Sequence, residues 1–447
     1  MRINGNAHFS HPPHLFSWCG PGMSGAGAAG DSVRRAVPVD QFRPMTQRIA
    51  FVAGSLPLGG STTLLLNLCP ELIRRNVPCA VFCGDGVHQM KQDFEDRGIP
   101  VFTHDFTRIF EDRVADTLTA IDAFRPTIVV ATTGKYSFEV LRYYPTSVLR
   151  VAMVQTDHAS HYSELSHYAD HLDAVVGVSR VIKARLDSMR VFSRARKIHI
   201  PYGVMMPDAS APSSNPAGVR VLYLGRLSNE QKRVFLFQKI LRDLYARKTD
   251  FTWTIAGDGP DAAQLRQSLL PLDNEKRVLF AGPVGYSDIP RLFREHDIFL
   301  LCSDYEGLPL SLLEGMGHGL IPVVTDIESG IREVVTPGNG FLIPPDAPDG
   351  YAAAIHRLSR SRDEMATLSR NAREAVMSGY SSEIMADRWE LLAGTNPHGT
   401  GAGVRLAKPA ILPPLTARHP FRFRFPLRNI RRLWRPARHL FMRRGKA

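Results

Sequence analysis

The sequence predicts an α/β protein with two Rossmann-like domains that face each other across a cleft. Short apolar segments of strand character alternate with longer amphipathic segments, which is typical of parallel strands joined by crossover helices. The pattern begins again after residues 207–217, a stretch rich in Pro, Ser and Ala that reads as a linker. Two such halves predict a ligand cleft between domains.

The chain divides by composition. Residues 1–44 are rich in Gly, Pro, Ala and His without periodicity, which favours a disordered, dispensable extension. The further divisions are a first domain at 45–206, the linker at 207–217, a second domain at 218–379, a helix at 380–394 that crosses back to the first domain, and a basic tail at 395–447.

Individual elements follow from apolar runs and helical periodicity. Strands are predicted at 48–54, 78–83, 100–102, 126–131, 149–155, 174–178, 219–224, 251–256, 278–280, 298–301 and 321–325. Helices are predicted at 61–75, 88–97, 114–124, 348–360, 363–377 and 382–393.

Composition excludes several classes of protein. Apolar content of 44% and charged content of 22% are globular values. The five cysteines show no Cys-x-x-Cys spacing, so a disulfide scaffold or zinc site is not expected and the chain reads as reduced and cytoplasmic. No apolar run reaches the roughly 18–20 residues of a membrane span, and the N-terminus lacks the apolar core of a signal peptide.

The net charge of +12 is concentrated in the tail. From Arg405 onward there are 13 Lys or Arg and no acid, which leaves 42 basic and 43 acidic residues before it. This distribution argues against specific nucleic-acid binding by the body. Within residues 421–444, aromatic and apolar residues interleave with arginine, as in a helix lying on an anionic membrane, where each basic residue contributes about 1 kcal/mol. A solvated disordered tail and nonspecific polyanion binding are the alternatives.

The most informative motif is a pair of carboxylates, Glu306 and Glu314, on either side of a short apolar turn that opens a helix. A strand precedes the turn, so both acids belong at the carboxyl edge of a parallel sheet, where α/β proteins bind ligands. Such acids can accept hydrogen bonds from sugar or ribose hydroxyls. The alternative is a helix N-terminus that uses acids to offset its dipole.

Basic residues follow an earlier strand of the same half. Arg226 and Lys232 lie where strand 219–224 gives way to a helix. Arg binds phosphate oxygens through parallel hydrogen bonds and Lys through its point charge, so the pair suits a diphosphate. A solvated basic turn is the alternative.

In combination these motifs resemble those of the retaining glycosyltransferases of the group-four family, which have the two-Rossmann-domain GT-B fold. The resemblance runs from about residue 45 to 392 and is strongest over 203–343. Its motifs are Tyr202-Gly203-Val204, Gly225-Arg226-Leu227 with Lys232, Gly257-Asp258-Gly259-Pro260, and Tyr305-Glu306-Gly307-Leu308-Pro309-Leu310-Ser311-Leu312-Leu313-Glu314-Gly315-Met316.

The resemblance implies roles for matching positions. Arg226 and Lys232 would hold the donor diphosphate and stabilise the leaving group, and Glu306 would lie beside the transferred sugar. Glu314 would accept from the ribose. The donor phosphate itself would take the acceptor's proton in a front-face substitution, with no metal and no other cofactor. The donor-binding set is Gly282, Val284, Gly307, Leu308, Pro309 and Glu314.

The first half would supply the acceptor side. Gly59 and Gly60 follow the first strand in a loop that nearly spells a P-loop, but Gly60 stands where the P-loop has Lys. The family uses such a glycine pair to bring phosphate and acceptor to a helix N-terminus. We assign Gln155 and Asp157 to the same acceptor side.

One position departs from the family. A histidine usually follows the strand at 149–154, and this chain has Gln155 there, with His158 three residues on. Either His158 takes the catalytic role from a shifted loop, or Gln155 serves by hydrogen bonding alone. The alternative to both is an exposed loop histidine.

The predicted function is hexose transfer from a nucleotide-diphospho-sugar to a glycan or lipid-linked acceptor, in the cytoplasm and peripherally at the inner face of the membrane. Two alternatives remain. One is a catalytically silent sugar-nucleotide-binding module, which the Gln155 departure favours. The other is a phosphorylase or epimerase on the same scaffold.

Overall fold

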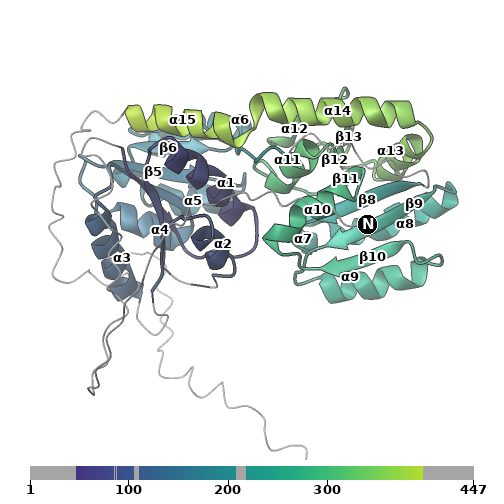
Figure 1. Ribbon diagram of the computed structural model, residues 1–447, viewed down its shortest axis with the longest axis horizontal. Helices are drawn as coiled ribbons and strands as arrows, with labels where there is room; N and C mark the ends of the chain where they lie inside the picture. The colour runs from purple at the N-terminus through teal and green to yellow at the C-terminus, as the bar shows by residue number, and fades with distance from the viewer. Residues whose placement is uncertain (1–46, 85, 87, 105–109, 208–217, 396–447) are drawn as a thin grey trace, which may run out of the picture. The chain divides into compact units, whose positions relative to one another are not determined.

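The computed structural model describes residues 47–84, 86, 88–104, 110–207 and 218–395. They form two parallel sheets with helices packed on them (Figure 1). The predicted extension at 1–44, the linker from 208 to 217 and the tail from 396 lie outside the described residues.

The N-terminal half (residues 47–207) holds a seven-stranded parallel sheet of order β3-β2-β1-β4-β5-β6-β7. Its inner strands are runs of buried apolar and β-branched residues, as expected for strands covered on both faces. The strands are β1 Ile49–Ala53, β2 Cys79–Cys83, β3 Val101–Phe102, β4 Ile128–Thr133, β5 Leu149–Val154, β6 Ala174–Gly177 and β7 Arg196–His199. The helices are α1 Gly60–Arg74, α2 Lys91–Glu95, α3 Phe110–Phe124, α4 Gly134–Leu141, α5 Ala159–Ser166 and α6 Arg180–Ser188.

The C-terminal half (residues 218–380) holds a six-stranded parallel sheet of order β10-β9-β8-β11-β12-β13. The strand order reverses between β8 and β11, and such switch points are where open α/β sheets bind ligands. The strands are β8 Val219–Leu224, β9 Phe251–Ala256, β10 Val278–Gly282, β11 Ile298–Leu301, β12 Ile321–Thr325 and β13 Phe341–Ile343. The helices are α7 Asn229–Lys232, α8 Phe237–Ala246, α9 Ala262–Leu269, α10 Ile289–Arg294, α11 Leu310–Gly317, α12 Ile331–Val334, α13 Asp349–Ser359 and α14 Arg362–Gly379.

The last helix, α15 (Ser382–Gly394), returns to the N-terminal half, as the sequence predicts. Trp389 of α15 meets Phe51 of β1 edge-to-face with ring centroids 5.8 Å apart. The crossing is fixed where Val204 donates to Tyr380 O at 2.9 Å and accepts from Ser382 N at 2.9 Å. A side chain on Gly203 would place Cβ 2.4 Å from Ser381 O, so only glycine fits at this crossing.

The predicted fold class is confirmed, but several elements differ from the prediction. The helix expected at 88–97 is shortened to α2, Lys91–Glu95. The short edge strand β7 was not predicted because its residues, Arg196-Lys197-Ile198-His199, are mostly charged or polar. Charged edge strands protect a sheet from further pairing, so their sequences lack the apolar signature of inner strands.

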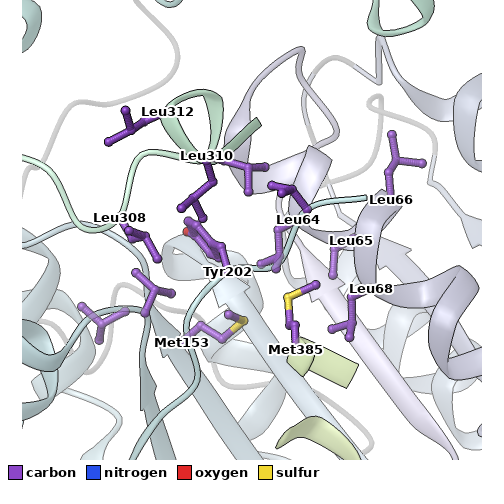
Figure 2. Close-up of a cluster of buried hydrophobic side chains, with 14 of the residues drawn as sticks. Leu64, Leu65, Leu66, Leu68, Met153, Tyr202, Leu308, Leu310, Leu312 and Met385 are labelled. Atoms are coloured by element: carbon purple, nitrogen blue, oxygen red, sulfur yellow. The ribbon is translucent and has the colours of Figure 1, made fainter. Parts of the chain in front are cut away.

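A cluster of buried side chains surrounds the chain crossing (Figure 2). Leu64 of α1, Tyr202, Leu308 and Leu310 of α11 are each at most 5% exposed. Burying a Leu side chain contributes roughly 1.5–3 kcal/mol. The Glu306–Glu314 motif is therefore anchored in the core by its own apolar residues.

Candidate functional site

Two helix N-termini lie side by side at the carboxyl edges of the sheets. Helix α1 begins at Gly60 and α11 at Leu310, and a Cβ on Gly60 would lie 3.5 Å from Leu310 Cβ. Neither helix has an acidic residue in its first turn or a side-chain cap. Because the first amides of a helix have no partners within it, adjacent N-termini favour an anion.

A buried ion pair links α7 to the loop that leads into α11. Lys232 Nζ donates to Glu306 Oε1, and Ser303 Oγ donates to the same oxygen at 2.6 Å. The two charged side chains are 15% and 8% exposed. Each predicted residue is thus held in one place, since a buried carboxylate must be paired and hydrogen-bonded.

Further contacts join helix α7 to the loop that carries Glu306. Gln231 donates from Nε2 to Tyr305 O at 3.1 Å, and Asp304 N donates to Gln231 O at 2.9 Å. Arg226 precedes α7 and is exposed. Among the described residues its guanidinium makes no ion pair, so this cation is available to a ligand.

Glu314 stands apart from the ion pair and lines a cavity of about 720 Å³. Burial raises the pKa of its carboxyl to about 8. Tyr286 on the same cavity donates to Asn67 Oδ1 at 3.1 Å and lies under the Arg97 guanidinium, 5.0 Å from the ring centroid. Met205 and Phe293 add apolar walls. The two acids of the motif therefore have different surroundings.

Glycine turns follow β8, β9 and β10 and pack on one another. Gly257 (φ 130°) would place a Cβ 1.9 Å from Gly225 O, so this approach requires glycine. Gly282 (φ 70°) accepts from Gly257 N at 2.7 Å. Val284 is half-buried next to this turn. Pro309 is the residue before α11, and Leu308 is buried beside it.

Comparison with known proteins identifies the half that carries this site. Residues 211–375 match the family model "Glycosyl transferases group 1". The match lies almost wholly within the C-terminal half of the chain. The chain is 33% identical to the lipopolysaccharide 1,6-galactosyltransferase of Salmonella typhimurium over 208 residues, 45% of this chain and 55% of that protein. It is 33% identical to the amylovoran biosynthesis glycosyltransferase AmsK of Erwinia amylovora over 173 residues, 37% of this chain and 42% of that protein. The chain spans about half the length of these relatives.

Solved structures of GT-B glycosyltransferases share the fold. The Staphylococcus aureus TarM structure superposes with a TM-score of 0.67 at 13% identity, covering 78% of this chain and all of TarM. The Anabaena HepE complex with UDP and glucose superposes with a TM-score of 0.64 at 20% identity, covering 78% of this chain and all of HepE.

Both ends of the Gln155 side-chain amide are hydrogen-bonded, at the position where the family that the motifs resemble usually has histidine. Gln155 donates from Nε2 to Thr132 O at 2.8 Å and accepts from the Tyr202 hydroxyl at 2.8 Å. Its backbone oxygen would lie 2.1 Å from a Cβ on Gly307. Gln155 thus joins β4, the chain crossing and the Glu306–Gly307 loop through its side chain and backbone.

The predicted catalytic residue His158 and the predicted acceptor-side residue Asp157 are also in contact with neighbours. His158 is exposed and caps α5, with Nδ1 2.8 Å from Ser160 Oγ. Its ring lies 5.0 Å from the Tyr305 ring. Asp157 accepts from the Tyr162 hydroxyl at 2.6 Å and pairs with Arg185 Nε at 2.8 Å. His158 is thus an exposed residue at the start of α5.

The sequence did not point to Ser303 or Asn67 as parts of the site, and it placed Tyr202 in a motif without giving it a role. Ser303 lies two residues after β11 and could have been found by its place near a strand end. Asn67 donates to Gly203 O at 3.1 Å, a contact across 136 residues that leaves no signal in the sequence. Within the described ranges, no three His, Cys, Asp or Glu side chains could share a metal ion, and no helix is long and apolar enough to cross a bilayer.

Proposed function

We propose that this chain is a retaining glycosyltransferase that moves a hexose from a nucleotide-diphospho-sugar to a glycan or lipid-linked acceptor. The observations that carry the proposal are the Lys232–Glu306 ion pair, which reaches the loop before α11, and the adjacent N-termini of α1 and α11. Together with exposed Arg226, these groups offer two cations and two sets of backbone amides to a diphosphate. The match of residues 211–375 to the group 1 glycosyltransferase model supports the same function.

The donor would lie across the C-terminal half. Its diphosphate would meet Arg226, Lys232 and the amides of Gly307 and Leu308, and its ribose would reach Glu314. The turn at Gly282 and Val284 would frame the base. UDP in the HepE complex supports a uridine diphosphate donor as the first to test.

The chemistry would consist mainly of stabilising the departing diphosphate. Arg226 and Lys232 offset the negative charge that grows on the leaving oxygen. Glu306 holds Lys232 in place and faces the transferred sugar. Gln155 has its side chain committed to Thr132 and Tyr202, so we assign the acceptor's proton to the donor phosphate. Attack and departure then occur on one face of the sugar, with retention.

The same cations make a metal unnecessary in this scheme. Charge on the leaving group is met by Arg226, Lys232 and two helix N-termini. We expect transfer to proceed unchanged in excess EDTA, and loss of activity that Mg²⁺ or Mn²⁺ restores would refute this part of the proposal.

The acceptor is proposed from the relatives. They include the Salmonella lipopolysaccharide galactosyltransferase and an Escherichia coli enzyme named for α-D-GlcNAc-diphosphoundecaprenol. Such acceptors reside at membranes, which fits the basic tail. Full-length protein should co-sediment with anionic liposomes and a chain ending at Pro397 should not. Equal sedimentation would argue against tail docking.

The function is tested with the full chain. A thermal-shift screen against UDP-, GDP- and ADP-sugars identifies the donor, because a ligand that binds only the folded state raises the melting temperature. Transfer to lipid-linked glycans is then followed by mass spectrometry, and NMR of the new anomeric centre should show retention. Inversion would overturn the mechanism.

Two other outcomes correspond to the alternatives. Donor binding without turnover on any glycan would indicate a silent sugar-nucleotide-binding module, which the engaged side chain of Gln155 favours. Sugar release by phosphate alone would indicate a phosphorylase, and epimerised donor an epimerase.

A further inference from the structure

Beyond the site residues, one turn of the C-terminal half reaches the N-terminal half. It follows β12 and comprises Ser329 to Glu333, ending in helix α12. It meets the first residue of α6, Arg180. The contact is made by a buried carboxylate, that of Glu333, whose side chain is 11% exposed.

Glu333 occupies the N-terminus of α6. Its Oε1 accepts from the Arg180 backbone N–H at 2.6 Å, while the α6 cap Ser179 accepts from Ile182 N at 3.2 Å. Helix α6 has no acidic residue in its own first turn. Because a helix N-terminus carries positive charge and unpaired amides, Glu333 supplies from the other half of the chain the anion that α6 lacks.

The same turn contacts the loop that follows Glu306. Gly330 N donates to Gly307 O at 2.7 Å, and a Cβ on Gly330 would lie 2.6 Å from that oxygen. On its other side Gly307 lies against Gln155 O and Val178. Gly307 is thus enclosed between Gly330 and the carboxyl ends of β5 and β6. Glu333 fastens this enclosure three residues beyond Gly330.

We propose that Glu333 is a positioning residue, which docks the 329–333 turn on α6 and so holds the Gly307–Leu308 loop against Gln155 in the arrangement that transfer requires. The proposal rests on the donor-binding role of that loop. Outside its own turn, Glu333 contacts Arg180, His199 and Tyr380, none of which is a predicted donor- or acceptor-binding residue. It acts through the loop, so its loss should affect the rate of transfer more than donor binding.

The chain offers three informative variants. Glu333→Ala removes the acceptor of the Arg180 N–H. Glu333→Gln keeps an oxygen that can accept it. Arg180→Ala keeps the backbone donor and removes only a guanidinium that lies 3.7 Å from Glu333 and is 82% exposed. Glu328→Ala is the matched control, since Glu328 is an exposed glutamate just before the same turn.

Kinetics of the full chain separate these roles. We expect Glu333→Ala to lower kcat about ten- to hundredfold, because small misplacements of reacting groups produce effects of this size. The Kd for the nucleoside diphosphate should stay within about threefold of the wild-type value. Glu333→Gln should restore kcat to within about threefold, because a neutral acceptor keeps most of the hydrogen bond. Arg180→Ala and Glu328→Ala should match the wild type.

Hydrogen exchange gives a readout that does not depend on turnover. Amides at 180–181 should exchange faster in Glu333→Ala and unchanged in Glu328→Ala. The proposal would be overturned if Glu333→Ala showed unaltered exchange or the same kcat as Glu328→Ala. It would also be overturned if Glu333→Ala had a lower melting temperature together with lost donor binding. If the wild-type protein showed no transfer activity, that result would count against the proposed function alone. The hydrogen-exchange comparison would still test the role of Glu333.

Discussion

The two halves of the chain use their predicted site residues differently. In the C-terminal half, Arg226 is exposed and Glu314 lines a cavity. In the N-terminal half, Gln155 and Asp157 have their side chains bonded to neighbours in that half or at the chain crossing. The N-terminal half instead offers backbone, at the N-terminus of α1 and at Gln155 O. The C-terminal half would thus recognise the donor with both side chains and backbone amides, whereas the predicted residues of the N-terminal half leave mainly backbone groups for a ligand.

The largest effect expected from this contrast is at Lys232. Lys232→Ala removes a cation that would stabilise the leaving diphosphate, and we expect kcat to fall by about 10²–10³. Transfer assays with the donor found by thermal shift measure this. Lys239→Ala, which alters a half-exposed lysine paired with Asp243 on α8, serves as control. If Lys232→Ala lowered kcat by less than threefold, Lys232 of the C-terminal half would not stabilise the leaving group.

The second prediction concerns Glu314 and pH. Its pKa is about 8 in the folded chain and about 4.3 in an unfolded one. Between these values the folded state holds one more proton, so the free energy of unfolding falls by up to about 1.4 kcal/mol per pH unit as pH rises. Glu314→Gln should remove this slope and stabilise the protein by a few kcal/mol at pH 8.5 but little at pH 5.

Denaturant unfolding at the two pH values measures the effect of Glu314. Glu374→Gln, at an exposed position on α14, is the matched control. The same pH slope in Glu314→Gln as in the wild type would show that the buried carboxyl of Glu314 does not govern this slope.

A smaller effect is expected at Gln155. Gln155→Leu leaves Thr132 O without its donor and the buried Tyr202 hydroxyl without its acceptor. An unsatisfied buried group costs about 1–3 kcal/mol, so unfolding should occur at lower denaturant concentration while donor binding persists. If Gln155→Leu kept wild-type stability but abolished transfer, Gln155 would be a catalytic residue. The two halves would then not differ in how they use their predicted side chains.

The smallest effect is expected at His158. Its exposed ring caps α5, and loss of such a cap costs about 1 kcal/mol of stability. We expect His158→Ala to change transfer rates by less than about twofold, because the ring of His158 is exposed. Abolished transfer with intact nucleotide binding would restore His158 as the catalytic residue of the N-terminal half.

Much of the fold could be predicted because inner parallel strands are continuous apolar runs. Strands β8, β9 and β12 appear with the predicted bounds. The edge strand β7 could not, since its polar residues resemble a loop. Arg226 follows β8, Lys232 ends the short helix α7, and the Glu306–Glu314 motif runs from the loop after β11 into α11. Local sequence fixes these positions. The partners of Gln155 and Glu333 depend on contacts 47 and 153 residues away, which no local pattern encodes.

The adjacent N-termini of α1 and α11 affect how the ligand-free protein unfolds. Two positive helix ends at one place repel each other, so a bound dianion acts as a counter-ion that links the two halves. Calorimetry should therefore show sharper, more cooperative melting with nucleoside diphosphate. High inorganic phosphate or sulfate should mimic part of this cooperativity and slow transfer by occupying the same amides.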